Sequence, residues 1–461
     1  MKKLSPVALA LAMAFPFGAQ AQSNADLKKE IDMLKAQIAE LKQMVLQKAA
    51  APAVPVAAPV ASNVGAELAK LRVKVEAMED AQEANGFGGL KFSGAIDPTY
   101  VYSQRAGRGQ FVFLNGTDGI ANDLTTDAFS YMNSNIGGVM LKFEKKFDND
   151  MMATIKLKPY KSVNTTWVEE SFLTIPIGDS RNVIVGKLNS YNGYEVVDSS
   201  EAKNVTHNLL YDFGGPLTMT GAGLNFKAAG MDWKTIAGNM NSDTDLPGTA
   251  NHNRGIHWRG DMALGEFSGW GISGMHGTLG GEVYNYLDVD YWFTRGDLTI
   301  NAQVELSKHK NMAFNGGDAG HVGLSGLVAY KLGEGWETVA RIDWLDDHKN
   351  GGSRGGETDC LGIFDGTQTG VAATSCGNYR SGWGPGAYFD DVDGGWALGD
   401  QNRGAKRTAL TLGLNYQFHE KALLKLEYRH DRSDLYTFYD FSSGSYKKSN
   451  NVIALQTVVK F

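Results

Sequence analysis

From Gly89 to Phe461, apolar and polar side chains alternate along the chain with a period of two. In LTINAQVEL at 298–306 and ALTLGLNYQF at 409–418, leucine, isoleucine, valine or an aromatic residue occupies nearly every second position, and mostly polar residues stand between them. Alternation of this kind gives the two faces of a β-strand different surfaces. We therefore expect this part of the chain to be all-β.

The connections between the expected strands alternate in length. Short turns at 147–150, 295–297 and 419–421 alternate with longer polar loops, which lie at 104–132, 190–216, 240–253, 307–319, 347–404 and 432–448. Outer-membrane barrels have this layout, with tight periplasmic turns and long external loops. A soluble β-sandwich is the alternative, but it does not explain why the loops alternate in length. The composition, with 56 glycines and 18 tyrosines beside 11 prolines, suits a large twisted sheet.

The sequence thus predicts an all-β transmembrane barrel of about 16 antiparallel strands over residues 89–461. The first strand is expected near 89–103 and the last near 449–461. An even number of strands places both ends of the barrel in the periplasm.

The first residues have the pattern of a signal peptide, which we assign to 1–21. Lys2 and Lys3 precede an apolar run to Phe17, and Ala19-Gln20-Ala21 is a small-x-small cleavage pattern. An uncleaved anchor helix is the alternative, but the run is shorter than the ~20 residues that span a bilayer. Export to the outer membrane is therefore expected.

Residues 22–48 carry a heptad pattern that predicts a short periplasmic coiled coil. Its seam comprises Leu27, Ile31, Leu34, Ile38, Leu41 and Val45. A homo-oligomer follows from a coiled coil, and Ile or Val alternating with Leu favours two strands; a single helix packed on its own domain is the alternative. A Pro/Ala-rich linker is expected at 49–63 and a second short helical segment at 64–85.

Two resemblances to known families support the barrel. VIVGKLNSYNGYEVVDSS at 183–200, followed by THNLLYDFGGPLTMTGAGLNF at 206–226, resembles the strand, Gly-Tyr-Glu loop and returning strand of the β-barrel porin-2 family. The coiled coil, with GLKFSGAIDPTY at 89–100 and LLKLEYRHDRSD at 423–434, resembles an uncharacterised family of exported proteobacterial proteins over most of the chain. These resemblances imply an oligomeric outer-membrane porin, with a trimer favoured, and they supply no catalytic residues.

The last strand resembles the signal read by the barrel assembly machinery, with an apolar residue at Val459 and an aromatic at Phe461. Gln456 departs from this signal, which often has glycine there. An interfacial aromatic girdle is the expected place for Phe461.

If the apolar faces contact outer-membrane lipid, the polar faces line a water-filled lumen. We expect a basic wall of Lys142, Lys156, Lys158 and Lys187, an acidic wall of Asp288, Asp290 and Glu305, and a mixed remainder of His257, Arg259, Asp261, Arg341, Asp343, Lys425, Glu427 and Arg429. Facing walls would create a transverse field. The alternative is that opposite charges pair locally to keep the interior solvated. Strict alternation allows only one of the neighbours Glu169 and Glu170 to face the lumen.

The loop at 347–404 is too long for a mere connection, and it either constricts the pore or caps it. Cys360 and Cys376 lie in this loop and, in an exported chain, are expected to form a disulfide. Its aromatic residues either pack or contact sugars, and its aspartates either bind Ca²⁺ or are solvated. These residues are Trp383, Tyr388, Phe389, Trp396, Asp390, Asp391 and Asp393.

Passive diffusion through a porin is the function that these features favour, with no cofactor or metal. The sequence has no GxSxG, HExxH or phosphate-binding GxxxxGK motif, which argues against an enzyme. A hydrolase whose Ser and His meet only in the fold stays open, and so does a structural anchor whose coiled coil reaches the cell wall. The net charge of -7 disfavours nucleic-acid binding.

Overall fold

The computed structural model describes residues 89–461 apart from 106, 115–135, 159–167, 215–217, 241–252, 280, 312, 314, 349–385, 393, 401 and 441. The chain divides into two units, Met1–Gln82 and Glu83–Phe461. The predicted signal peptide, coiled coil, linker and second helical segment lie outside the described residues. In the described part, no helix is long and apolar enough to cross a membrane.

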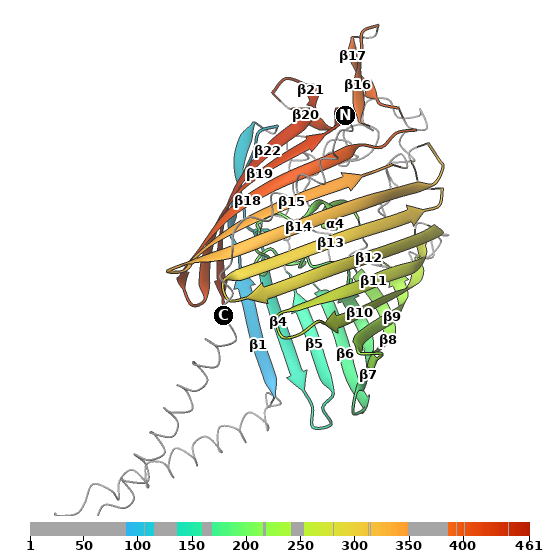
Figure 1. Ribbon diagram of the computed structural model, residues 1–461, viewed down its shortest axis with the longest axis vertical. Coiled ribbons are helices and arrows are strands. Elements are labelled where there is room, and N and C mark those ends of the chain that lie inside the picture. Colours follow the sequence, from blue (N-terminus) through green and yellow to red (C-terminus); the bar gives the residue numbers. More distant parts are fainter. Residues whose placement is uncertain are drawn as a thin grey trace, which may run out of the picture. The chain divides into compact units, whose positions relative to one another are not determined.

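Strands form almost all of the second unit (Figure 1). They are β1 (Leu90–Ile96), β2 (Thr99–Ser103), β3 (Arg108–Val112), β4 (Val139–Lys146), β5 (Met152–Leu157), β6 (Val168–Gly178), β7 (Arg181–Asn189), β8 (Thr218–Ala228), β9 (Met231–Met240), β10 (Arg254–Ala263), β11 (Ser268–Leu279), β12 (Glu282–Arg295), β13 (Leu298–His309), β14 (Ala319–Gly333), β15 (Trp336–Asp346), β16 (Ala387–Asp390), β17 (Gly395–Leu398), β18 (Lys406–His419), β19 (Ala422–Ser433), β20 (Phe438–Asp440), β21 (Ser445–Lys447) and β22 (Ser449–Lys460). One short helix, α4 (Leu209–Phe213), precedes β8.

Eighteen of these strands form a single antiparallel sheet that closes on itself. β1 and β2 are two halves of the first barrel strand, interrupted at Asp97 and Pro98. β3 pairs with β2 and β4 pairs with β1, so β3 and β4 are the halves of the second barrel strand. The barrel therefore has sixteen strands, which confirms the predicted fold class.

β22 closes the barrel by pairing with β19 on one side and with β1 and β2 on the other. At this seam the backbones of Phe461 and Gly94 exchange two hydrogen bonds of 3.0 Å. The Phe461 ring lies 5.8 Å from the Phe92 ring. A Cβ on Gly94 would lie 2.5 Å from the Phe461 ring, so glycine is the residue that fits there.

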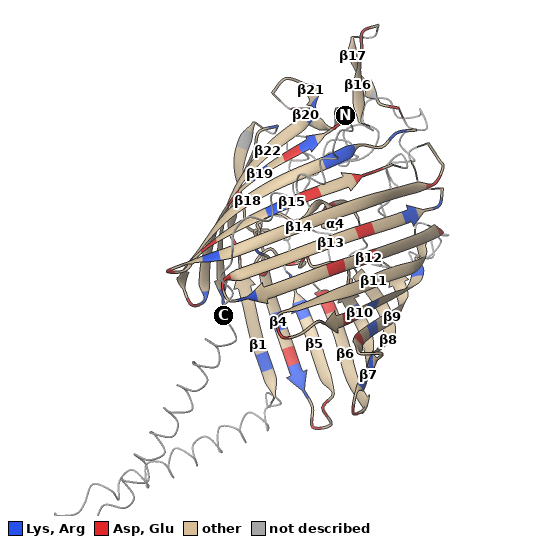
Figure 2. Ribbon diagram, viewed as in Figure 1, with Lys and Arg blue, Asp and Glu red and all other residues tan. Residues whose placement is uncertain are grey.

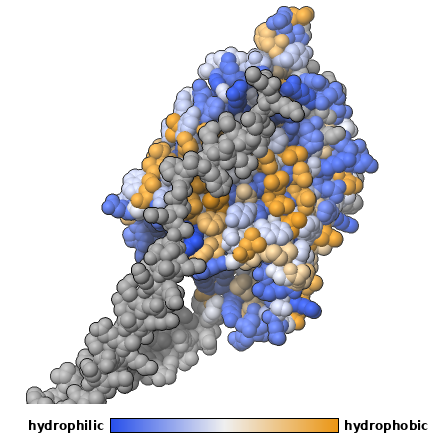
Figure 3. All heavy atoms as spheres, viewed as in Figure 1, coloured by the Kyte–Doolittle hydropathy of each residue, from blue (hydrophilic) through white to orange (hydrophobic). Residues whose placement is uncertain are grey.

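The alternation has the orientation expected for a barrel in lipid. On β13, Val304 and Leu306 are each 43% exposed on the outer face, whereas Glu305 between them is buried. Apolar side chains (orange) gather on the outer face that Figure 3 shows. Because the strands pair all round the barrel, their backbone polar groups are satisfied without water, as a membrane span requires.

Part of the inner face, from β7 to β12, departs from this pattern. Ile184, Leu188, Met219, Ile236, Met240, Met275, Leu279, Tyr284 and Tyr286 form a buried apolar cluster. On β7 these buried residues alternate with the exposed Val185. The inner face is therefore not polar throughout.

Candidate functional site

The candidate site is the segment of residues 190–214, which leaves β7 and returns through α4 to β8; we call it the lumen loop. Its side chains at Ser199, Val205, Leu209 and Leu210 are at most 1% exposed. Its partners are inward-facing residues of β10, β12, β15 and β19, far away in the sequence. The loop therefore runs through the inside of the barrel. In Figure 1, α4 appears within the outline of the barrel, where it contacts β14 and β15.

Local sequence explains why α4 forms and where it ends. The Asn208 side chain accepts a hydrogen bond of 2.7 Å from the backbone N–H of Tyr211, which caps the N-terminus. The helix ends at Gly214, where a Cβ would lie 1.7 Å from Oε1 of Glu305. On the facing wall, a Cβ on Gly323 would lie 2.8 Å from the Leu210 side chain. Two glycines therefore let the helix lie directly on the barrel wall.

A repeated Arg-x-Asp pattern holds the lumen loop. It occurs at Arg259–Asp261 on β10, Arg341–Asp343 on β15 and Arg429–Asp431 on β19. In each case the arginine Nε donates to the aspartate two residues further along, over 2.7, 3.1 and 2.9 Å. The period of two puts both side chains on the inner face. Each aspartate therefore fixes the direction of its arginine.

The terminal nitrogens of these arginines bind backbone carbonyls of the lumen loop. Nη1 of Arg259 donates to Tyr191 O over 2.9 Å, Nη1 of Arg341 to Thr206 O over 2.8 Å, and Nη1 of Arg429 to His207 O over 2.7 Å. Buried backbone carbonyls need such donors, because a loop inside a barrel has no ladder to join. The three arginines thus satisfy backbone carbonyls of the loop, as strand pairing satisfies those of the barrel wall.

Two further wall residues bind the loop backbone from β19. Glu427 accepts hydrogen bonds from the N–H groups of Val205, at 2.6 Å, and Thr206, at 3.2 Å, and from the Thr206 hydroxyl at 2.6 Å. The Lys425 ammonium donates to the carbonyls of Ser199 and Ala202. Acceptors and donors of the wall therefore alternate along one strand and match the N–H and C=O groups of the loop.

The Gly-Tyr-Glu sequence at 193–195 contacts a different part of the barrel wall. Gly193 N–H donates to Asp288 over 3.0 Å, the Tyr194 hydroxyl lies 2.6 Å from that of Ser325, and Glu195 pairs with Arg341 at 3.2 Å. Burial raises the pKa of Glu195, and the positive charge of Arg341 opposes this shift. This part of the loop is thus fixed by three side chains of the wall.

Lys156 and Lys158 hold the lumen loop from the opposite side through Asp198, which both ammonium groups contact. Lys158 also pairs with Glu169 at 3.1 Å, and Lys156 with Glu170 at 3.9 Å. The expectation that only one of these glutamates can face inward is therefore wrong. A β-bulge is the reason: Lys156 pairs with Glu170 but Leu157 pairs with Val168, so the register skips Glu169 and the alternation shifts by one.

Some members of the two predicted walls are paired with opposite charges close by. Lys142 lies 2.9 Å from Glu144 on its own strand, and Asp290 takes a bidentate contact of 2.6 and 2.9 Å from Arg259. Figure 2 shows acidic and basic positions distributed over the same strands. Opposite charges therefore pair locally at these positions, whereas like charges are cross-strand neighbours at Asp288 and Glu305 and at Lys142 and Lys156.

The prediction that Lys187 lines the lumen is wrong, because Lys187 lies on the outward-facing side of β7, the side of the exposed Val185. Ile184 and Leu188 occupy the inner parity that the apolar pattern led us to place outside. His257 is fully buried on β10 and stacks on Tyr191 of the lumen loop at 5.0 Å. It therefore packs against the loop instead of meeting open water.

The described part of the 347–404 loop includes the hairpin β16–β17, which packs beside the β20–β21 hairpin. Ala387 N–H donates to Tyr436 O over 2.8 Å, and the Trp396 ring lies 5.3 Å from that of Tyr446. Asp390 caps its own turn by accepting from Val392 N–H at 2.9 Å. Packing is thus the observed role of Trp396. Cys360, Cys376, Trp383 and Asp393 lie outside the described residues.

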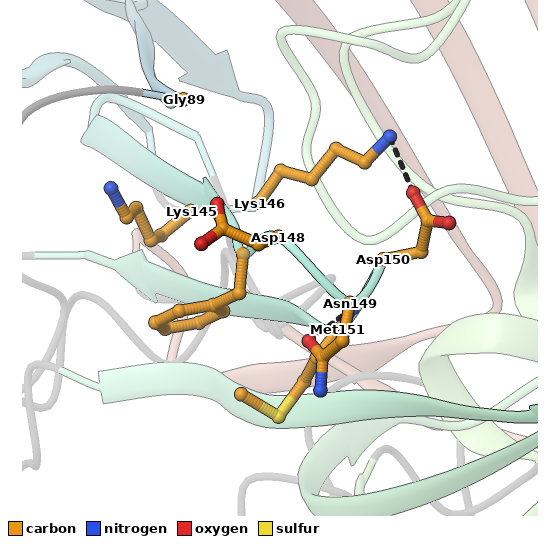
Figure 4. A pocket seen from close by; sticks show the side chains of 8 residues that line it. Gly89, Lys145, Lys146, Asp148, Asn149, Asp150 and Met151 are labelled. Atoms are coloured by element: carbon orange, nitrogen blue, oxygen red, sulfur yellow. Dashed lines mark hydrogen bonds and ion pairs between the residues drawn. The ribbon is translucent and has the colours of Figure 1, made fainter. Parts of the chain in front are cut away.

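An open groove lies at the β4–β5 turn, where Lys145, Lys146, Asp148 and Asp150 surround it (Figure 4). Lys146 and Asp150 pair at 2.7 Å, and both side chains are mostly exposed. Exposed pairs of this kind contribute little to binding or stability. Among the described residues, no group of three or more His, Cys, Asp and Glu side chains is arranged to hold a metal ion.

Comparison with solved structures finds barrels that resemble this one at low sequence identity. The anion-selective porin from Comamonas acidovorans is 10% identical with a TM-score of 0.49, over 81% of this chain and 99% of that one. The outer membrane channel DcaP of Acinetobacter baumannii is 11% identical with a TM-score of 0.48, over 81% and 97%. OmpF of Salmonella typhi, in complex with daunomycin, is 12% identical with a TM-score of 0.47, also over 81% and 97%.

No curated protein matches the chain. A family model matches it over residues 1–255 and 239–461, which together span the whole sequence. The chain therefore belongs to the family described as a protein of unknown function, DUF3138.

Proposed function

We propose that this protein is an outer-membrane porin through which small hydrophilic solutes or ions diffuse passively, and that the lumen loop sets the width of the path. The observation that supports this most directly is the set of three Arg-x-Asp pairs, each bound to a backbone carbonyl of the loop. Charge-assisted hydrogen bonds of this kind fix a loop in one position. A fixed loop inside a barrel gives a constriction of defined size.

The water path is proposed to run along β4, β9 and β10. The inner side chains of Lys142, Glu144, Lys234 and Asp261 remain 35, 22, 45 and 29% exposed. The arginines and acids of β12, β15 and β19 are instead covered by the lumen loop. Because Lys142 pairs with Glu144 and Lys234 with Asp261, this path carries mixed charge. We therefore expect weak ion selectivity and no strong transverse field.

The proposal includes the surroundings of the barrel. The outer faces would contact outer-membrane lipid, and Val459 and Phe461 would be read by the assembly machinery. The segment 22–85 would lie in the periplasm, where its heptad seam would join copies of the chain; the seam itself favours two strands, and the family resemblance favours a trimer. The signal peptide at 1–21 supports export, and the exposed apolar outer faces support insertion in lipid.

Single-channel conductance in planar bilayers tests the proposal. Stepwise openings are expected for the purified protein, with a reversal potential near zero under a KCl gradient. Replacing residues 196–212 by a short Gly/Ser linker should raise the conductance, whereas deleting the outer hairpin at 387–398, the control, should not raise it as much. A protein that is folded and inserted but silent in all three forms would overturn the proposal and favour an anchor.

A further inference from the structure

Ser307, His321 and Glu305 lie together on the inner face of β13 and β14. Ser307 and His321 are direct cross-strand neighbours. The Ser307 hydroxyl lies 2.7 Å from Nδ1 of His321, and Nε2 of the same ring lies 2.5 Å from Oε1 of Glu305. We propose that these three residues form a catalytic triad that hydrolyses small carboxylic esters that enter the lumen.

The burial of the three side chains fits the three roles. Glu305 and His321 are 0% exposed, whereas Ser307 is partly exposed. A nucleophile must be reached by its substrate, while the base and the carboxylate that orients it work best away from water. Gly214, at the end of α4, lies against Glu305, and Leu210 lies over Gly323, the cross-strand neighbour of Glu305. The lumen loop therefore covers the acid and leaves the serine partly open.

Further contacts hold Glu305 in the orienting role. The Tyr286 hydroxyl donates to Oε2 of Glu305 over 3.1 Å, which leaves Oε1 for His321. With Nε2–H donated to the carboxylate, Nδ1 is the ring nitrogen that accepts the serine proton. Other inner serines have different partners: Ser325 donates to Asp343 at 2.7 Å and Ser199 to Asp97 at 2.7 Å. Ser307 is thus bonded to a base, whereas these two are bonded to acids.

The reaction would follow the acyl-enzyme route. Oγ of Ser307 attacks the ester carbonyl carbon as His321 Nδ1 takes the hydroxyl proton, and the imidazolium then gives this proton to the leaving alcohol as the C–O bond breaks. Water next attacks the acyl-serine, again with His321 as the base. The acid leaves, the proton returns to Ser307, and the products are one carboxylic acid and one alcohol.

A covalent serine probe tests the proposal on the full-length folded protein. A small fluorophosphonate should label Ser307, located by mass spectrometry, and Ser307→Ala should lose the label. His321→Gln should slow labelling by about 10²–10⁴-fold, the usual worth of a general base. Glu305→Gln should slow it less. Ser273→Ala, which removes a buried inner serine of β11, is the matched control and should be labelled like the parent.

Gel migration without heating shows that each variant is a folded barrel, and conductance of the same preparations shows whether the channel is intact. A folded, conducting parent that takes no label at Ser307 would overturn the triad and leave the porin untouched. Equal labelling rates for the parent and His321→Gln would also overturn it, because the histidine would then not act as a base. A labelled but silent barrel would keep the triad and count against the porin.

Discussion

Replacing Glu427 by alanine should release the lumen loop from the wall without unfolding the barrel. Glu427 accepts from two loop N–H groups, those of Val205 and Thr206, and from the Thr206 hydroxyl. An orphaned buried N–H costs about 1–3 kcal/mol, so two cost about 2–6 kcal/mol. This is enough to populate an undocked loop, because solvent in the lumen can satisfy the freed groups.

Conductance and proteolysis measure this release. Glu427→Ala should give larger or noisier single-channel steps and faster cleavage within 196–212 by a soluble protease. Glu427→Gln is the matched variant: its amide keeps one accepting oxygen and loses the other, so an intermediate effect is expected. Asp150→Ala, in the exposed pair with Lys146, should change nothing. Conductance steps of the parent size in folded Glu427→Ala barrels would refute the reasoning.

Three further predictions concern the loop, the seam and the wall. Burial and the nearby Arg341 lower the pKa of His207 to about 3, below the ~6.5 of a free histidine, so docking is most stable above about pH 6.5. The free energy of loop docking should weaken as the pH falls from about 6.5 towards 3, by up to roughly 1.4 kcal/mol per pH unit. Single-channel conductance should therefore rise at pH 4, and His207→Gln should lack this rise. Gly94→Ala places a Cβ 2.5 Å from the Phe461 ring, and such overpacking costs about 1–3 kcal/mol. The temperature at which the barrel loses its folded gel migration should therefore drop. An unchanged temperature would mean that the seam tolerates the methyl group. Lys187→Ala should leave conductance and reversal potential unchanged because Lys187 is on the outer parity, and a shifted reversal potential would place its charge in the lumen instead.

Alternation in the sequence predicted the barrel because it reports directly which strand face meets lipid. On β13 and β18 the pattern is regular, and the outer positions 304, 306, 410, 412 and 414 are the exposed ones. The same reasoning failed wherever the alternation shifts. The bulge at Glu169 turns two neighbouring residues to one side, and on β7 both parities are apolar at 183–185, so periodicity alone could not orient Lys187.

The position of the lumen loop inside the barrel was harder to predict, because a long polar connection has the same sequence pattern whether it lies in water or inside a barrel. One signal was present: of the five Arg-x-Asp occurrences, those at 259–261, 341–343 and 429–431 lie within strands at inner-facing positions, whereas those at 295–297 and 432–434 fall at strand ends. An arginine whose Nε is taken by its own aspartate still has donors to place elsewhere. The partners of those donors, the carbonyls of Tyr191, Thr206 and His207, carry no side-chain signature.

The buried charges of the wall are better understood as positioning devices than as sources of barrel stability. A buried ion pair gains little over apolar packing of the same volume, since desolvation offsets its attraction. The barrel itself is held by its closed ladder of backbone bonds, which needs none of Arg259, Arg341 or Arg429. What these arginines add is a set of donors at fixed points, each bound to a backbone carbonyl of the loop. Substitutions in the Arg-x-Asp pairs should therefore change the channel at constant barrel folding, and this separation is what makes the role of the lumen loop testable.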